Sequence, residues 1–255
     1  TVTGVPTWEL YDDFSFGSLD FEKWETLAWG GGEIPLILNG RVFFSGSQNT
    51  NSWVQGTLKE EYLAYYNNPE IRELGPDSHS ILSFRNANFQ NTHGVEFELS
   101  VSSTYQNAET GIGLFCYDEY EPNYGFFLDA WKSSGDGKLK LEFGIIGDDV
   151  LPDDQRFEYI SDGWGYIDFI EIQYDTSYKI AYLMKNDTLY FYLDGVEVGQ
   201  ISYDSSRPHS VAAFRGMNED GDNFAANIDN VKILQDSYEP SLPTPPASPE
   251  SLLGY

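Results

Sequence analysis

The chain has 255 residues, of which 41 are Asp or Glu and 14 are Lys or Arg, so its formal net charge is −27. This charge repels nucleic acids and anionic membranes and excludes both as expected direct partners. One cysteine cannot form an internal disulfide, and with three histidines the chain lacks the ligands of a Cys/His zinc or haem site. No apolar run approaches the roughly 20 residues of a membrane span.

Apolar and polar residues alternate along most of the chain, which predicts antiparallel strands with one face in a core. In chain order, strands are expected at residues 41–45, 80–85, 95–102, 110–117, 125–131, 138–145, 169–174, 178–184, 189–194, 210–215 and 227–234. Turn signals such as Asn39-Gly40 and Asp194-Gly195 separate them. About a dozen strands with short turns predict one β-sandwich or barrel domain over residues 1–236.

One segment departs from the strand pattern. Thr57 and Glu60 match a capping box, and Leu58, Tyr62 and Tyr65 follow at helical spacing until Pro69. A short helix or helical turn is expected there.

Residues 237–255 differ in kind, because they hold five of the twelve prolines and show no alternation. The composition fits an extended, solvated linker or tail. The segment ends in Leu252-Leu253-Gly254-Tyr255, which is apolar for a free tail. The alternative is therefore a segment that packs on a neighbouring subunit in a homo-oligomer or polymer.

The thiol and the imidazoles show no sign of a reactive site. Leu114, Phe115 and Tyr117 surround Cys116, which favours a buried strand thiol over a reactive one. The three histidines, His79, His93 and His209, are scattered among turn-like residues, and we expect each to lie on the surface.

Three stretches carry a resemblance to the concanavalin A-like lectin/glucanase superfamily. The first, from Asp12-Asp13-Phe14 through a Gly/Ser/Leu-Asp turn to Lys23-Trp24, is similar to the opening of these domains. The second, Tyr190 to Val198 around Asp194-Gly195, resembles the strand–turn–strand hairpin of laminin-G-like jelly rolls. The third, Ala226 to Ile233, is similar to their last strand. The matches fall in the expected order and frame residues of about 8 to 234.

The resemblance implies a jelly roll, in which two curved antiparallel sheets pack face to face. In many lectins and enzymes of the superfamily the concave sheet or its edge loops bind sugar. The same fold also hosts hydrolases, lyases and structural modules, so the fold alone does not fix the function.

Glucanases of this superfamily carry their catalytic carboxylates on one strand as Glu-x-Asp-x-x-Glu or Glu-x-Asp-x-Glu, and the sequence has no such motif. Glu96 and Glu98 are the nearest substitutes: they share a strand face, with side chains about 7 Å apart. The alternative is a solvated sheet face. Asp168 and Glu171 would face opposite sides of a regular strand. The missing motif favours a domain that is not an enzyme; a glycoside hydrolase or polysaccharide lyase is the alternative.

Calcium is implied by the same resemblance, because these families often hold a structural Ca²⁺ on the convex side. Asp229 matches the last-strand Asp ligand, Gly40 matches the turn carbonyl, and Glu9 is the nearest match in the N-terminal strand. Oxygen ligands of this kind suit calcium. Alternatively, Asp229 hydrogen-bonds neighbouring backbone. Residues 218–223 form a second oxygen-rich loop, for which a plain acidic turn is the simpler interpretation.

Aromatic residues make up 16% of the chain, and many fall on polar strand faces or in loops. Flat rings stack on sugar rings, so a carbohydrate site is predicted from Tyr117, Tyr120, Tyr124, Trp131, Trp164 and Tyr166. Each ring alone could instead pack in the core or rim, and the same composition suits protein–protein contacts. Asn186-Asp187-Thr188 is an N-glycosylation sequon.

Three functions follow from these observations. The first is a secreted, non-catalytic, calcium-stabilised domain that binds a glycan or acts in adhesion. The second is a structural subunit of an extracellular filament, sheath or surface layer that uses residues 237–255 for subunit contacts. The third is a glycoside hydrolase or polysaccharide lyase. The acidic charge and the polar aromatics lead us to expect an extracellular location.

Overall fold

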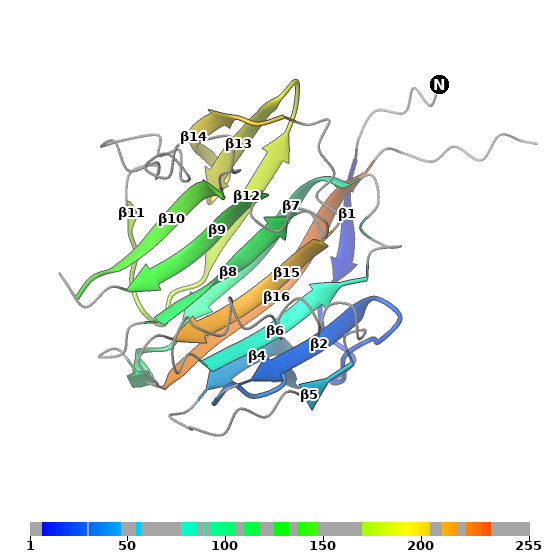
Figure 1. The fold of residues 1–255 in the computed structure, drawn as a ribbon, viewed down its shortest axis with the longest axis vertical. Helices are drawn as coiled ribbons and strands as arrows, with labels where there is room; N and C mark the ends of the chain where they lie inside the picture. The colour runs from blue at the N-terminus through cyan, green and yellow to red at the C-terminus, as the bar shows by residue number, and fades with distance from the viewer. Residues whose placement is uncertain are drawn as a thin grey trace, which may run out of the picture.

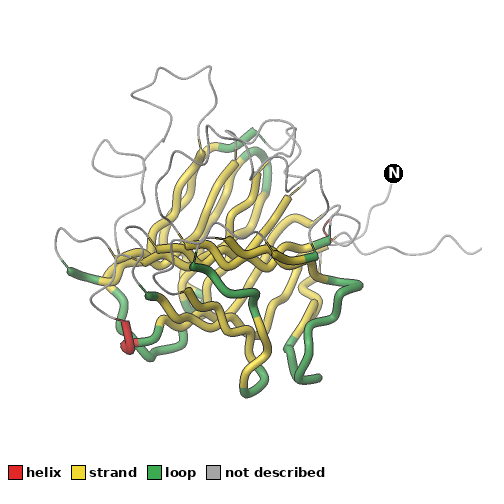
Figure 2. The backbone as a smooth tube through the Cα atoms, turned by 60° about the horizontal axis from the view of Figure 1, so that its bottom comes forward, coloured by secondary structure: helices red, strands yellow, loops and turns green. Residues whose placement is uncertain are grey.

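The computed structural model describes residues 7–29, 31–46, 55–57, 78–85, 89, 92–105, 110–117, 125–132, 137–146, 170–204, 211–218 and 223–235. Within these ranges the chain forms two antiparallel sheets of eight strands each, which overlap in Figure 1 with their strands along similar diagonals. Figure 2 shows that strands dominate the described backbone, with a short 3₁₀ helix, η1 (Ser103–Tyr105), as the helical element. None of the described helices is long and apolar enough to span a membrane.

The first sheet, sheet A, has the strand order β14-β13-β12-β7-β16-β4-β3, and β1 pairs with β16 beside this path. Its strands are β1 (Thr7–Asp12), β3 (Leu36–Leu38), β4 (Arg41–Gly46), β7 (Thr92–Val101), β12 (Tyr178–Met184), β13 (Thr188–Leu193), β14 (Val196–Ser202) and β16 (Phe224–Gln235). The first and last described strands are therefore neighbours.

The second sheet, sheet B, has the order β11-β10-β9-β8-β15-β6-β2-β5. Its strands are β2 (Trp24–Trp29), β5 (Gln55–Gly56), β6 (Ser78–Phe84), β8 (Thr110–Tyr117), β9 (Gly125–Lys132), β10 (Leu139–Ile146), β11 (Ile170–Glu171) and β15 (Val211–Asn218). The predicted antiparallel β-sandwich is confirmed.

Most predicted strands are confirmed, and β8 and β12 have the predicted bounds. Of the strand predicted at 169–174, residue 169 lies outside the described residues and β11 holds Ile170 and Glu171; a turn with Asp175 at φ 56° follows. β1, β2, β3 and β5 were not among the predicted strands. In β1, four of the six residues are exposed and show no alternation. The predicted helix after Thr57 and the predicted tail at 237–255 lie outside the described residues.

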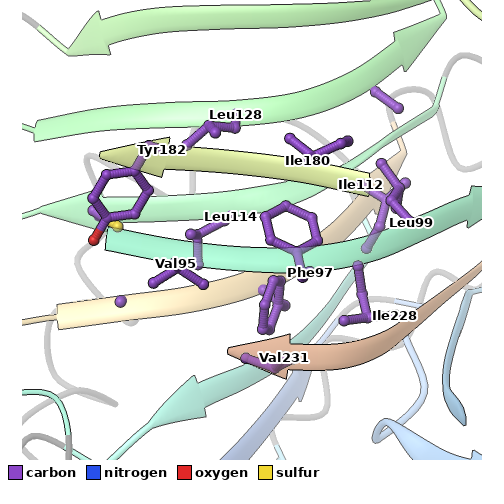
Figure 3. Packing of buried hydrophobic residues seen from close by; sticks show 14 of the residues in the cluster. Val95, Phe97, Leu99, Ile112, Leu114, Leu128, Ile180, Tyr182, Ile228 and Val231 are labelled. Carbon is purple, nitrogen blue, oxygen red and sulfur yellow. The ribbon is translucent and has the colours of Figure 1, made fainter. Parts of the chain in front are cut away.

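The core lies between the sheets and is built from the inward half of each alternating pattern. Val95, Phe97 and Leu99 of β7 point into it, and Figure 3 shows them beside Leu114 of β8 and Leu128 of β9. All five side chains are buried. Burying such side chains is the main favourable term in folding, at about 25 cal/mol per Å² of apolar surface.

Cys116 also lies in this core, as predicted. Its side chain is fully buried, and burial raises the pKa of the thiol far above its ordinary value. A thiol that stays protonated is a poor nucleophile. Its role is therefore packing.

The N-terminal motif links the two sheets. Asp12, at the end of β1 in sheet A, accepts a hydrogen bond from Trp24 Nε1 of β2 in sheet B at 2.8 Å. Its other carboxylate oxygen accepts the Phe14 N–H at 2.9 Å. Trp24 is fully buried and its ring centroid lies 4.5 Å from that of Phe84. The buried carboxylate is thus satisfied by two donors while it ties β1 to β2.

Candidate functional site

We call the face of each sheet that points away from the core its outer face. On the outer face of sheet B, four residues lie side by side across neighbouring strands: Arg215 of β15 pairs with Gly113 of β8, Gly113 with Asp129 of β9, and Asp129 with Glu142 of β10. Residues directly opposite in an antiparallel sheet project to the same side. The register therefore gathers one arginine and two acids in a row.

Glycines on the neighbouring strands make room for the outer-face side chains of β9. A Cβ on Gly111 would come within 2.3 Å of the Trp131 ring, and a Cβ on Gly144 within 2.5 Å of the Phe127 ring. At Gly113 it would lie 2.4 Å from the Asp129 Cβ. Phe127, Asp129 and Trp131 therefore lean over glycines, and each needs its glycine to keep its position.

Asp129 and Glu142 are an adjacent, buried acid pair. The exposed fractions are 6% for Asp129 and 8% for Glu142. Burial, with Lys140 opposing it, raises the pKa of Glu142 to about 7. Burial and then the neighbouring Glu142 raise the pKa of Asp129 well above its ordinary value, against the attraction of Arg215. Asp129 Oδ1 is buried and has no hydrogen-bond partner among the described residues.

His79 corrects a prediction, because the structure buries it at 3% exposure instead of placing it on the surface. It lies on β6, and its Nδ1 accepts a hydrogen bond from Arg215 Nε at 3.0 Å. Burial and then the Arg215 charge hold the pKa of His79 well below its ordinary value. A neutral imidazole thus orients the guanidinium of Arg215. His93 is half-buried, and His209 lies outside the described residues.

Aromatic rings border this row. The Phe115 and Phe127 rings stack with centroids 5.8 Å apart, and the Arg215 guanidinium lies 5.5 Å from the centroid of Phe115. Trp131, predicted as a sugar-binding residue, is half-buried on the same face as Asp129, two residues further along β9. The outer face of sheet B thus combines flat rings with charged groups.

Of the other predicted sugar-binding residues, the described part of the chain includes Tyr117. Tyr117 ends β8 and pairs with Gly125. Tyr120, Tyr124, Trp164 and Tyr166 lie outside the described residues.

The three outer-face residues of β9 have the spacing of the glucanase motif Glu-x-Asp-x-Glu but not its composition. They are Phe127, Asp129 and Trp131, so an aspartate stands in the middle and an aromatic residue at each end. Alternation sends all three to one face, as that motif requires. The second acid of this face, Glu142, comes from the next strand instead.

Glu96 and Glu98, the acids singled out from the sequence, lie on the outer face of sheet A. Lys232 Nζ donates to Glu96 Oε1 at 2.7 Å, and Asn230 Nδ2 donates to Glu98 Oε1 at 3.2 Å. Both acids border a pocket of about 260 Å³, lined by Glu96, Phe97, Glu98, Lys179, Asn230 and Lys232. The two glutamates share a face as expected, and each has a partner of its own. Asp168 lies outside the described residues, and Glu171 is exposed and pairs with Lys138.

The calcium prediction depends on Asp229, whose carboxylate already has two partners. Arg41 Nε lies 3.3 Å from Asp229 Oδ2, and the Asn230 N–H donates to Oδ1 at 2.8 Å. Gly40 precedes Arg41 in the β3–β4 turn, and Glu9 pairs with Ile233. The described part of the chain brings together no group of three metal-ligating side chains. These residues fit a calcium ion poorly, since it would have to displace Arg41; calcium stays a prediction.

The sequon residue Asn186 lies in the exposed turn between β12 and β13, with φ 52°. Lys185 and Thr188 close this turn through two backbone hydrogen bonds of 2.9 and 3.1 Å. The position is accessible, and glycosylation there stays a prediction.

Sequence reasoning missed Asp129, Glu142, Arg215 and Gly113 as members of one site. Each looks like an isolated residue in an alternating strand, and only the register of β8, β9, β10 and β15 makes them neighbours. One signal was present: Asp129 stands among Phe127, Leu128 and Ala130, which is an apolar setting for a carboxylate.

No protein-family model and no curated protein sequence matches this chain. Solved structures do match, and among them are enzymes that act on polysaccharides. The catalytic domain of an endo-1,3-β-glucanase (laminarinase) from Thermotoga petrophila RKU-1 is 12% identical, with 92% of this chain and 100% of that chain covered at a TM-score of 0.57. A lichenase from a mouse hindgut metagenome is 11% identical, with 91% and 99% covered at a TM-score of 0.52.

A κ-carrageenase from Pseudoalteromonas carrageenovora is 10% identical, with 90% of this chain and 96% of that chain covered at a TM-score of 0.53. At such identities the likeness concerns the fold, and function must be argued from the site. Together with the two eight-stranded sheets, these matches confirm the resemblance drawn from the sequence. The chain has the concanavalin A-like lectin/glucanase fold, a jelly-roll sandwich.

Proposed function

We propose that the outer face of sheet B binds a carbohydrate without cleaving it. The observation that carries the proposal is the half-buried ring of Trp131 on β9, which lies on the same face as the buried ring of Phe127 and the buried carboxylate of Asp129. Rings of this kind offer flat apolar surface, and a neighbouring carboxylate or guanidinium bonds hydroxyl groups. These three positions of β9 lack the two glutamates with which the resembling glucanases cleave sugar chains.

Two further observations support this proposal. The solved structures of the same fold named above act on β-glucans and carrageenan, so this scaffold suits extended sugar chains. The net charge of −27 disfavours sulfated or uronic acid polymers, which makes neutral glucans the first ligands to test. Since such polymers lie outside cells, we also propose that the domain is secreted.

Binding is tested by affinity electrophoresis and calorimetry with a β-1,3-glucan and a β-1,3-1,4-glucan. Replacing Trp131 with Ala should weaken binding about tenfold or more, because losing an aromatic platform costs on the order of 1–2 kcal/mol. Trp8→Ala is the matched control: Trp8 is 43% exposed but lies on β1 of sheet A. Equal losses in both variants, or no binding to any neutral glucan, would refute the proposal.

Hydrolysis by Asp129 and Glu142 is the second candidate. Directly opposite residues have Cβ atoms about 4.5–5.5 Å apart, which is compatible with the carboxylate separation of about 5–5.5 Å in retaining glycosidases. The protonated member of the pair would protonate the leaving oxygen while the ionised member attacks the anomeric carbon. Release of reducing ends that disappears in both Asp129→Asn and Glu142→Gln would favour this function. Binding with no release favours the first.

A further inference from the structure

Asp129 and Glu142 differ from the other described acids in being buried next to each other. The charged or titratable groups that face them come from each neighbouring strand of sheet B. These groups are Lys140 on β10, Glu171 on β11, Arg215 on β15 and His79 on β6, with the Glu25–Arg85 ion pair at the far side. Gly113 stands between Arg215 and Asp129 and contributes no side chain.

Among the described residues, these groups do not supply two full positive charges to the two carboxylates. Arg215 donates to His79 and lies over the Phe115 ring, while Lys140 is opposite Glu171 as well as next to the pair on β10. Two like charges about 5 Å apart in a buried setting repel strongly. One proton held between them removes the repulsion.

We propose that Asp129 and Glu142 share one proton in the folded protein, and that its loss above neutral pH loosens the β9–β10 part of the outer face of sheet B. The pair thus acts as a pH-sensitive switch on the outer face of sheet B, which also carries Trp131. Because Trp131 is on β9 two residues from Asp129, loosening this strand pair also moves a ring of the proposed binding face; this second consequence rests on the proposed function.

The direction of the stability change follows from proton binding. Glu142 has an ordinary pKa of 4.5 and a folded-state pKa of about 7, so between these values the folded protein binds more protons than the unfolded chain. The stabilisation from this group is complete below the ordinary pKa and is lost as the pH rises through about 7. Asp129, with its pKa raised in the same direction, adds to this loss.

The first test needs no ligand: the melting temperature of the full chain is measured from about pH 5 to about pH 9. We expect the wild-type Tm to fall by roughly 5 °C across neutrality, since about 1 kcal/mol corresponds to about 2–4 °C for a domain of this size. Glu142→Gln, which keeps the shape of a protonated Glu, should flatten most of this fall. Glu9→Gln, which removes an exposed acid on β1 of sheet A, should leave the fall unchanged.

A direct measurement covers the case in which Glu142→Gln does not fold. Infrared difference spectra of the wild type should show a protonated carboxyl band that persists at about pH 6 and disappears above about pH 8. Asp129→Asn should remove or shift this band. Carboxyls that are all ionised by about pH 6, or a Tm profile that Glu142→Gln leaves unaltered, would overturn the shared proton.

Glucan binding measured over the same pH range separates the two proposals. If binding weakens at least threefold above neutral pH and this loss vanishes in Glu142→Gln, the switch controls the binding face. If no glucan binds at any pH but the Tm profile and the infrared band behave as expected, the shared proton stands and the proposed function fails. If glucan binding does not change with pH while Tm does, the coupling between the acid pair and the binding face is refuted.

Discussion

The outer faces of the two sheets treat their acids in opposite ways. On sheet A, Glu96 lies 2.7 Å from Lys232, and Glu98 accepts the Asn230 amide at 3.2 Å. On sheet B, Asp129 and Glu142 are each other's cross-strand neighbours, and one Asp129 oxygen has no partner among the described residues. Strand register produces both arrangements. On sheet A each of the two glutamates has a partner, whereas on sheet B the two acids lie next to each other.

This difference shows where function is to be sought. A paired acid on a half-exposed face contributes little to stability and needs no further explanation. A buried acid beside a second acid lowers stability at neutral pH, and folded proteins keep such groups mainly where they serve a site. The contrast also explains why Glu96 and Glu98, so visible in the sequence, are the less informative pair.

The largest expected effect comes from filling the space beside Asp129. In Gly113→Ala the new Cβ would lie 2.1 Å from the Leu128 carbonyl oxygen, so β9 must shift. We expect the free energy of unfolding in urea to fall by about 1–3 kcal/mol, as for other overpacked sites. Ser100→Ala on the outer face of sheet A should change it by about 0.5 kcal/mol or less. Equal effects at both positions would remove the distinction between the faces.

A smaller effect, with opposite signs on the two sheets, is expected from neutralising one acid. Near about pH 8, Asp129→Asn should raise Tm by about 3 °C, because it removes the like charge beside Glu142. Glu96→Gln should lower the free energy of unfolding by about 1 kcal/mol at most, because it leaves Lys232 without its carboxylate. Thermal melts at the same pH give both values. Changes of the same sign would contradict the comparison.

The smallest effect concerns calcium. Because Arg41 already supplies a positive charge to Asp229, we expect EDTA to change the wild-type Tm by about 1 °C or less. Arg41→Ala frees that carboxylate, and added calcium should then raise Tm more than it does in the wild type. A large EDTA effect on the wild type would show that calcium binds despite Arg41, at Asp229 or elsewhere in the chain.

Much of the fold could be predicted from the sequence, because alternation reports directly on a two-sided sheet. β7 shows this best: Val95, Phe97 and Leu99 are buried, while Glu96 and Glu98 between them are less so. Alternation fails where a strand has no buried side. β1 is such a case, since it packs against β16 at the margin of the sandwich and leaves Trp8 and Leu10 exposed.

The site was harder to predict, because strand order joins residues that are distant in the chain. Arg215 and His79 are 136 positions apart and yet form a hydrogen bond. No local pattern encodes that contact. The prediction that His79 lies on the surface failed for this reason, since turn-like neighbours such as Asp77 and Ser78 say nothing about what β15 brings against the imidazole.

The pairing of β1 with β16 has a consequence for how the protein is made. Thr7 lies opposite Gln235, so sheet A lacks one of its strand pairs until nearly the whole domain has left the ribosome. β7, near the middle of the chain, pairs with β16 along one edge, and this pairing also forms only after β16 has been synthesised. Contacts of such long sequence separation form slowly. The nascent chain therefore stays incompletely folded during synthesis. In this state chaperones can bind it and, if it is exported, it can be translocated before it folds.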